Sequence, residues 1–532
     1  MTEPTRIGVL CVHGVGDQRP GAFVEELAEA LLSALRRDDP ARSRVWEIAD
    51  RNPAVIKISI GPKAKGGRPV ELFLHEVHWA DLDDSPSAIG SLRFWWWGFS
   101  QWSRYAPPKF VLKGAQESMI TSGAPEAVGF FDRLKLFGAA TIVCAAALLI
   151  RVLTRALDFV PVIGPGFRWL LGRFRPAATI VEYAGDVKLY VSDAQSRDPL
   201  ERRHAYPRVA IRRRMIRAMV DVAQSGYERW YVLAHSLGSV VAFNALMETE
   251  AALPNYLGAA ACARLRQEPY GWLHLKDGSH HAEMMPSRPP HVRPDEVLCR
   301  RRLFEKLAGF MTYGSPLDKF YSMWRPIVPI NKDLDVLGER FQWINAYEDL
   351  DPIGACLNFV GLEEMTAKSR LVPQNYRAST CRWLGIAHIA YFRRLAFLRR
   401  QKEPTELCVH TARWLVDGEQ FAAAAGSGLT RCESQPAQWP VYSQAVAASL
   451  LMALIAGAAF YASPFGSLGS LEPPQAILIA AFAYLVLCGL LVLIVGAADW
   501  SLRRAQRALT ARLARFASRS PQAGSESLQV SG

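Results

Sequence analysis

Charged residues are missing from two long stretches near the end of this 532-residue chain. Residues 441–462 contain none over 22 positions, and residues 475–498 contain none over 24. About 20 apolar residues cross the hydrocarbon layer of a bilayer. A buried helix pair in a soluble core is the competing interpretation, but both runs are long and evenly apolar for that. We therefore predict a transmembrane helical hairpin over residues 441–498.

Positive charge is also absent from the segment that joins these two runs. Residues 463–474 contain no Lys or Arg, whereas the tail at 499–532 contains six Arg between 503 and 519. Lys and Arg near membrane spans favour the cytoplasmic side. Two spans return the chain to the side on which it started, and strand-like residues from Ile7 leave no room for a secretory signal. We expect a multi-pass membrane protein whose folded domain and tail are both cytoplasmic.

Cysteine is scarce, and no metal-binding pattern is present. The nine cysteines are scattered and odd in number, which argues against a disulfide-stabilised secreted domain and favours free thiols. No set of His, Cys or carboxylates has metal-ligand spacing, so we expect no metal and no cofactor.

The net charge of +12 and an Arg-rich block at 202–217 fit an anionic lipid surface. A nucleic-acid motif is lacking, so we expect no nucleic acid as partner.

The segment Ala234-His235-Ser236-Leu237-Gly238 is the most informative part of the chain. An apolar run at 230–233 precedes it and a helix-like run at 239–246 follows it. A strand, a tight turn with a central Ser and a helix form the nucleophile elbow, whose usual pattern is G-x-S-x-G. Ala234 replaces the first Gly, and Gly238 keeps the second. We interpret His235 as a structural hydrogen-bonding residue; an ordinary helix N-cap at Ser236 is the alternative.

A second motif follows the first strand-like run. Residues 7–12 are apolar and lead into His13-Gly14-Val15-Gly16, which is typical of a loop that binds an oxyanion. Acyl transfer needs two N–H donors aimed at the developing oxyanion, and we assign them to Val15 and Leu237. A dinucleotide-binding turn is the alternative, but the third Gly that it needs is missing.

A nucleophilic Ser also needs a base and an orienting carboxylate. Asp351 follows a strand-like run at 341–347 and lies in a turn, Asp-Pro-Ile-Gly, that holds a side chain in place; Asp349 is its nearest rival. His388 lies in a small-residue stretch at 385–391 and is our candidate base. His410 is the other candidate, but it lies in an amphipathic helical pattern at 407–415.

Taken in order, these motifs give the chain a resemblance to a known family. The motifs at 13–16, 234–239, 314–317 and 343–352 resemble those of lipase-like α/β hydrolases over roughly residues 6–415, and residues 185–190 look similar to a segment of intracellular DDHD-type phospholipases. The resemblance implies that Ser236 attacks an ester carbonyl and His388 accepts its proton. It also implies that Asp351 orients His388, that Val15 and Leu237 stabilise the oxyanion, and that water releases an acyl-enzyme.

The order of strand-like and helix-like runs predicts the fold class and the domains. Their alternation indicates an α/β fold with a doubly wound, mostly parallel sheet, and the resemblance implies that this is an α/β-hydrolase fold. Predicted strands cover 6–12, 54–60, 69–78, 185–191, 230–234, 309–313 and 341–347, and predicted helices cover 21–36, 200–225 and 237–249. The predicted domains are a hydrolase domain (1–417) with an apolar, Trp-rich, membrane-facing insertion or lid (91–178) and a cap loop (254–300), a linker (418–440), the hairpin (441–498) and a basic tail (499–532).

Together these features predict a membrane-anchored serine hydrolase. Its partners are expected to be the lipid bilayer and a lipid or other apolar carboxylic ester. Two alternatives stay open at this stage. One is a non-catalytic lipid-binding or scaffold protein that keeps the fold, and the other is a thioesterase or peptidase tethered to the membrane.

Overall fold

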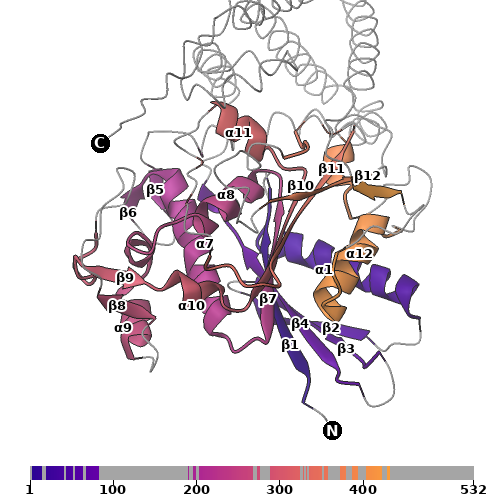
Figure 1. Ribbon diagram of the computed structural model, residues 1–532, viewed down its shortest axis with the longest axis horizontal. Helices are drawn as coiled ribbons and strands as arrows, with labels where there is room; N and C mark the ends of the chain where they lie inside the picture. Colours follow the sequence, from indigo (N-terminus) through magenta and orange to yellow (C-terminus); the bar gives the residue numbers. More distant parts are fainter. Residues whose placement is uncertain are drawn as a thin grey trace, which may run out of the picture. The chain divides into compact units, whose positions relative to one another are not determined.

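Figure 1 shows the computed structural model of the chain. The residues that the structure describes all belong to one compact unit. They are residues 3–14, 19–40, 44–51, 54–63, 67–82, 190, 196–198, 203–267, 272–275, 288–323, 328, 331, 335–349, 351, 353–357, 372–378, 386–392, 403–421 and 428–431. The predicted hairpin at 441–498, the basic tail and the insertion at 91–178 lie outside these residues, as do Val15 and Gly16.

A nine-stranded sheet forms the centre of this unit, in the order β13-β12-β11-β10-β7-β1-β4-β3-β2. The six strands from β12 to β4 are parallel, whereas β13 at one edge and β3 and β2 toward the other pair antiparallel. The strands are β1 (Thr5–Val12), β2 (Arg44–Arg51), β3 (Ala54–Ile60), β4 (Val70–Val77), β7 (Arg229–His235), β10 (Leu307–Tyr313), β11 (Gln342–Glu348), β12 (Gln374–Ala378) and β13 (Leu429–Arg431).

The burial of the strands follows from their position in the sheet. Six consecutive residues of β1 are buried, as expected of a parallel strand covered on both faces, whereas buried and partly exposed residues alternate along β3. Two small antiparallel sheets lie apart from the main one, β5 (Ser196–Asp198) with β6 (Arg203–Ala205) and β8 (Leu273–Leu275) with β9 (Glu296–Leu298).

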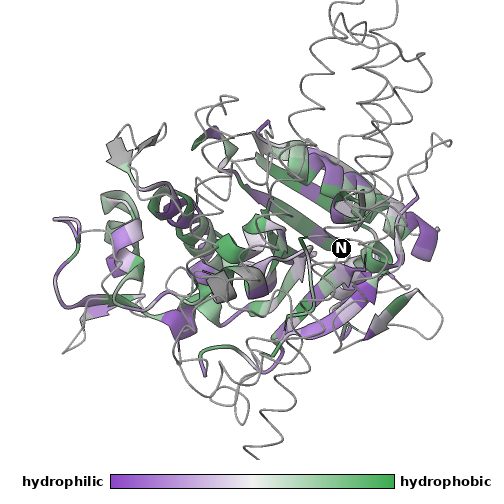
Figure 2. Cartoon of the chain, turned by 90° about the horizontal axis from the view of Figure 1, so that it is seen from above, coloured by the Kyte–Doolittle hydropathy of each residue, from purple (hydrophilic) through white to green (hydrophobic). Residues whose placement is uncertain are grey.

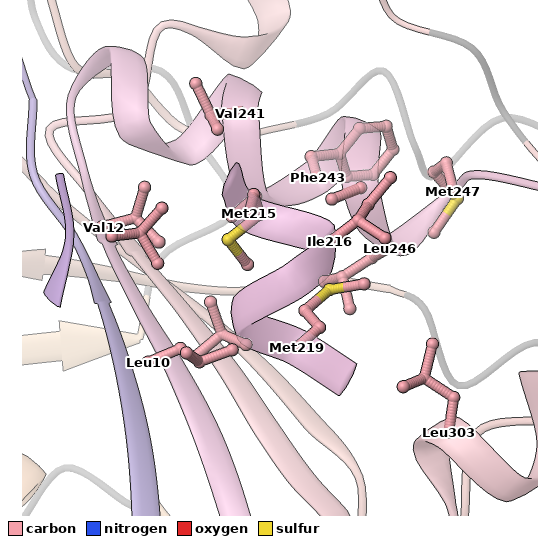
Figure 3. Packing of buried hydrophobic residues seen from close by; sticks show 14 of the residues in the cluster. Leu10, Val12, Met215, Ile216, Met219, Val241, Phe243, Leu246, Met247 and Leu303 are labelled. Carbon is pink, nitrogen blue, oxygen red and sulfur yellow. The ribbon is translucent and has the colours of Figure 1, made fainter. Parts of the chain in front are cut away.

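Helices cover both faces of the main sheet, and each face has its own apolar core. One core joins α7 (Pro207–Gln224) and α8 (Leu237–Leu246) to the strands; Figure 3 shows Met215 and Met219 of α7 beside Leu10 and Val12 of β1. The other core joins α1 (Ala22–Asp38) and α12 (Glu406–Asp417) to the opposite face. Figure 2 shows hydrophobic residues concentrated along the central strands. The shorter helices are α9 (Ala259–Gln267), α10 (Arg300–Phe304) and α11 (Leu317–Met323).

The structure confirms the predicted α/β class with a mostly parallel sheet. Of the predicted strands, those at 6–12, 54–60, 69–78, 230–234, 309–313 and 341–347 are present, with ends that differ by at most two residues. The helices predicted at 21–36 and 237–249 are α1 and α8.

The structure differs from the sequence predictions at four places. The helix predicted at 200–225 begins only at Pro207, because proline suits the first turn of a helix and disfavours helix in the residue before it. Tyr190, from the strand predicted at 185–191, is helical. The cap loop at 254–300 contains α9, β8 and β9. The linker at 418–440 contributes β13 to the main sheet.

Within the described residues, no helix has the length and apolar character needed to cross a membrane.

Candidate active site

Ser236 lies at the sharp turn between strand β7 and helix α8. Its backbone has φ 52° and ψ −127°, and among the described residues it is the only non-glycine residue with a positive φ. Such a conformation costs about 1–3 kcal/mol and persists where the surrounding structure enforces it. The amide N–H of Ser236 donates to the Tyr313 carbonyl (3.0 Å), and the Ser239 N–H donates to the Ser236 carbonyl (3.0 Å). Both backbone groups of the strained residue are therefore fixed.

Glycines make room for this turn on both sides. A Cβ on Gly238 would lie 2.4 Å from the His13 carbonyl oxygen, and a Cβ on Gly14 would lie 2.7 Å from the Cβ of Ser236. Helix α8 thus packs directly on the backbone at the end of β1, and Gly14, just after β1, lies directly against Ser236. Gly14 of one motif and Gly238 of the other are needed for this close approach.

The hydroxyl of Ser236 interacts with His388 and does not cap the helix. Ser236 occupies the N-cap position of α8 without a side-chain capping bond, so the alternative interpretation as an ordinary N-cap is wrong. Its Oγ lies 2.8 Å from Nε2 of His388, and both side chains are buried.

His388 also contacts the carboxylate of Asp351 with its other ring nitrogen. Nδ1 lies 3.0 Å from Oδ1 and 2.9 Å from Oδ2 of Asp351. An ionised carboxylate only accepts hydrogen bonds, so Nδ1 carries the proton and Nε2 is free to accept the proton of Ser236. The three side chains form one continuous chain of hydrogen bonds, although they come from positions 236, 351 and 388.

Asp351 is held in its ionised form. Burial raises its pKa, but the electrostatic interaction with His388 and the hydrogen bonds from His388 and Tyr391 outweigh burial, so the pKa lies well below its usual range. The Tyr391 hydroxyl donates to Oδ2 (2.6 Å), and the Ile353 N–H donates to Oδ1 (2.7 Å). The carboxylate therefore has a fixed orientation and a fixed charge.

The rival candidates for acid and base lie elsewhere. Asp349 forms an ion pair with Arg377. His410 lies in α12, where its ring is near that of Phe421, and burial lowers its pKa. Of the four candidates, the structure brings only Asp351 and His388 to Ser236.

His235 supports the site from the neighbouring position. Its Nε2 donates to the backbone carbonyl of His388 (2.8 Å), and its ring stacks on Tyr313 with centroids 4.9 Å apart. Burial and the nearby His388 lower the pKa of His235 to about 3. The ring is therefore neutral at physiological pH and acts as a fixed hydrogen-bond donor.

His13 has a similar role in the loop after β1. Its ring stacks on the Trp79 ring with centroids 4.9 Å apart, and the backbone N–H of Trp79 donates to Nε2 of His13 (3.1 Å). Nδ1 must then carry the proton that binds the Gly14 carbonyl (2.8 Å). Burial lowers the pKa of His13 to about 3, a change that the Gly14 hydrogen bond partly offsets. His13 thus fixes the carbonyl of Gly14 beside Ser236.

Two further glycines surround His388 and Asp351. Gly314 has φ 59°, and a Cβ there would lie 3.0 Å from Cε1 and Nδ1 of His388. A Cβ on Gly354 would lie 2.6 Å from Oδ2 of Asp351. The motifs at 314–317 and 351–354 therefore supply the space that the acid and the base occupy.

Sequence reasoning missed three polar residues of the site: Tyr391, Ser239 and Ser315. Tyr391 comes three residues after His388, and a tyrosine in an apolar stretch gives no sign of its partner. Ser239 follows the elbow pentapeptide, and Ser315 belongs to the motif at 314–317, so the motifs themselves were the available signal. Among the described residues, no group of His, Cys, Asp or Glu is arranged to hold a metal ion.

Three arginines of α7 bind partners within the protein. Arg212 pairs with Glu248 (2.9 Å), Arg214 pairs with Asp81, and Arg217 donates to the Tyr256 carbonyl (3.0 Å). The sequence suggested that the block at 202–217 contributes to a lipid-binding surface; for these three arginines, internal pairing is the better explanation.

Comparisons with protein-family models, with curated proteins and with solved structures found no match to this chain.

Proposed function

We propose that the protein is a serine hydrolase of the α/β-hydrolase type that cleaves a carboxylic ester through an acyl-enzyme on Ser236. The observation that carries the proposal is the hydrogen-bonded chain from Ser236 through His388 to Asp351, built on a strained strand-to-helix turn. A nucleophile, a base on its hydroxyl and a carboxylate on the base are the three parts that such chemistry needs. The order Ser, Asp, His along the chain also agrees with the resemblance to lipase-like hydrolases.

The geometry supports a specific sequence of steps. Ser236 Oγ attacks the ester carbonyl carbon while its proton moves to Nε2 of His388, and the carbonyl oxygen becomes an anion. The tetrahedral intermediate then collapses, the C–O bond to the alcohol breaks, and His388 gives its proton to the leaving oxygen. Water repeats the steps on the acyl-enzyme, releasing the acid and restoring Ser236.

Backbone N–H groups are the proposed donors to the oxyanion. Leu237 is the first residue of α8, so its N–H has no acceptor within the helix. Val15 is the second proposed donor and follows Gly14, which lies against Ser236.

An apolar substrate and a membrane location are part of the proposal. They rest on the uncharged runs at 441–462 and 475–498 and on the Trp-rich segment near 95. Near the site, Ile389 directly follows the base and is 47% exposed, although His388 itself is buried. An exposed aliphatic side chain beside the base is suited to contact an acyl chain. The location is tested by membrane fractionation with alkaline extraction; release of the chain by alkali would argue against spanning segments.

The experiment that tests the chemistry is labelling of detergent-extracted protein with a fluorophosphonate, alongside hydrolysis of p-nitrophenyl esters. Wild type should react, whereas Ser236→Ala and His388→Ala should lose both labelling and turnover. Asp351→Asn should lower kcat by about 10⁴-fold, because the base loses its orienting carboxylate. Asp349→Asn is the matched control and should keep turnover.

The outcome also separates the alternatives. Folded wild type that neither labels nor hydrolyses any ester, with lipid present, supports a lipid-binding or scaffold protein. Rates that rise with acyl chain length support an apolar ester, whereas faster cleavage of soluble thioesters or peptides supports a tethered thioesterase or peptidase.

A further inference from the structure

A pair of buried serines lies directly behind the nucleophile turn. We propose that Ser239 and Ser315 are positioning residues that fix the peptide between Ser236 and Leu237, and so aim the Leu237 N–H at the oxyanion. This inference rests on the proposed function, because it assigns these hydroxyls a part in the acyl transfer at Ser236.

The hydrogen bonds define one direction of donation through the pair. Ser239 Oγ donates to the Ser236 carbonyl (2.6 Å), and it lies 2.7 Å from Ser315 Oγ. A hydroxyl has a single proton. Since Ser239 uses its proton on Ser236, the proton between the two serines must come from Ser315. The Leu317 N–H in turn donates to Ser315 Oγ (3.3 Å).

This relay acts on the peptide that carries the proposed oxyanion donor. The peptide unit is planar and trans, so its C=O and its N–H point in opposite directions. With the Ser236 carbonyl bound by the hydroxyl and the N–H of Ser239, the Leu237 N–H must point away from Ser239. Its orientation is then set before substrate arrives, which is what makes such a donor effective.

Both hydroxyls are buried and have no access to water. Ser239 and Ser315 are both 0% exposed, so water cannot replace either hydroxyl in this position. Ser239 lies on α8, and Ser315 lies between β10 and α11. The relay therefore ties the start of α8 to the end of the neighbouring strand, across the turn that holds the nucleophile.

The test compares Ser239→Ala, Ser315→Ala and the double variant with wild type. Ester hydrolysis gives kcat, KM and their pH dependence, and an alkylboronic acid, which forms an anionic tetrahedral adduct with a reactive serine, gives transition-state affinity. Thr411→Val is the matched control, because the buried Thr411 hydroxyl donates to the Leu407 carbonyl in α12 (2.7 Å).

Ser239→Ala should lower kcat and boronate affinity by the same factor, about tenfold, because a loosened donor costs less than the 10²–10³-fold of a missing one. KM and the pH midpoint should stay unchanged, since substrate binding and the His388–Asp351 pair are not altered. Ser315→Ala should have a smaller effect, and the double variant should resemble Ser239→Ala, because Ser315 acts through Ser239. Thr411→Val should keep wild-type kinetics.

Several results would overturn the inference. One is wild-type kcat in Ser239→Ala; another is a shifted pH midpoint, which would place the effect on His388; a third is additive loss in the double variant. Amide hydrogen exchange over residues 236–240 tests the same hydroxyls without turnover, and unchanged exchange in Ser239→Ala also overturns it. Wild type that does not react with fluorophosphonate contradicts the proposed function itself, and the exchange result then still decides whether Ser239 holds the turn.

Discussion

At the scale of single residues, the orienting acid is the most heavily bound group of the site. Asp351 receives hydrogen bonds from the His388 ring, the Tyr391 hydroxyl and the Ile353 N–H. Tyr391 is itself fixed, because its oxygen accepts from the Glu348 N–H (3.2 Å). The charge that orients the base is thus stabilised by residues that take no direct part in the proposed reaction.

Removal of the Tyr391 hydroxyl tests this stabilisation. Tyr391→Phe should lower kcat about tenfold, which corresponds to a barrier raised by about 1.4 kcal/mol, because the carboxylate that orients the base loses a hydrogen bond. It should also reduce the free energy of unfolding by about 1–3 kcal/mol. The hydroxyl stabilises the ionised carboxylate, so its contribution is fully present above the usual carboxyl pKa of about 4 and is lost as pH falls through the lowered pKa of folded Asp351. The difference in unfolding temperature between wild type and variant should therefore be constant from pH 5 to 8 and shrink only in stronger acid, as folded Asp351 itself becomes protonated. A difference that grew in acid would contradict this account.

At the scale of elements, the site depends on how closely turns and strand ends approach one another. The first residues after β1, β7, β10 and β11 meet at one edge of the sheet, because the carboxyl ends of parallel strands lie side by side. Gly14, Gly314 and Gly354 each occupy a place where a Cβ would overlap a site residue. These glycines let the elements meet at the distances that the hydrogen bonds require.

Gly314→Ala should disrupt the site more than the fold. Gly314 and Gly226 both have positive φ, but a Cβ on Gly314 would lie 3.0 Å from the His388 ring, whereas a Cβ on Gly226 would meet nothing within 4 Å. Both Ala variants should lose about 1 kcal/mol of stability from backbone strain. Only Gly314→Ala should also lower kcat, by displacing His388. Equal kcat in the two variants would show that His388 tolerates the added methyl group.

The sequence was sufficient for the parts of the site that follow from local patterns. The apolar strand before Ser236 and the small residues around it require a sharp turn. A carboxylate or a histidine that follows a parallel strand is confined to the carboxyl end of the sheet, where that turn also lies. It was not sufficient for Tyr391, Ser239 and Ser315, because their partners lie up to 76 residues away along the chain. The edge strand β13 was missed for a related reason. A three-residue strand has no periodicity, and only its pairing with β12 defines it.

At the scale of the whole molecule, neutral histidines inside the fold, of which His13 is buried and His235 and His75 are half-buried, should make the protein sensitive to acid. Burial is the main cause that lowers the pKa of His13 and of His235 to about 3 and of His75 to about 4. The unfolded chain takes up protons near pH 6.5, whereas the folded protein does not. The free energy of unfolding is therefore greatest above about pH 6.5. As pH drops below 6.5, it should fall by about 1.4 kcal/mol per pH unit for each histidine.

Urea unfolding between pH 7.5 and 5 measures this loss. His75→Gln should reduce the slope, because it removes one such group from β4, where Nε2 of His75 contacts the Tyr227 hydroxyl (2.8 Å). The half-buried Glu25, which pairs with Arg19, supplies the control: Glu25→Gln should leave the slope unchanged. A slope that is the same in His75→Gln and wild type would show that His75 does not contribute.

The strand order also determines when each strand can find its partner during synthesis. β1 is synthesised before the other strands of the sheet, yet it lies in the middle of the sheet between β4 and β7. It can pair with β4 early, but its other edge has no partner until residues 229–235 have been synthesised. The unpaired backbone groups of such an apolar edge can pair with other chains. During this interval the nascent chain therefore carries an unpaired strand edge that folding of the finished sheet removes.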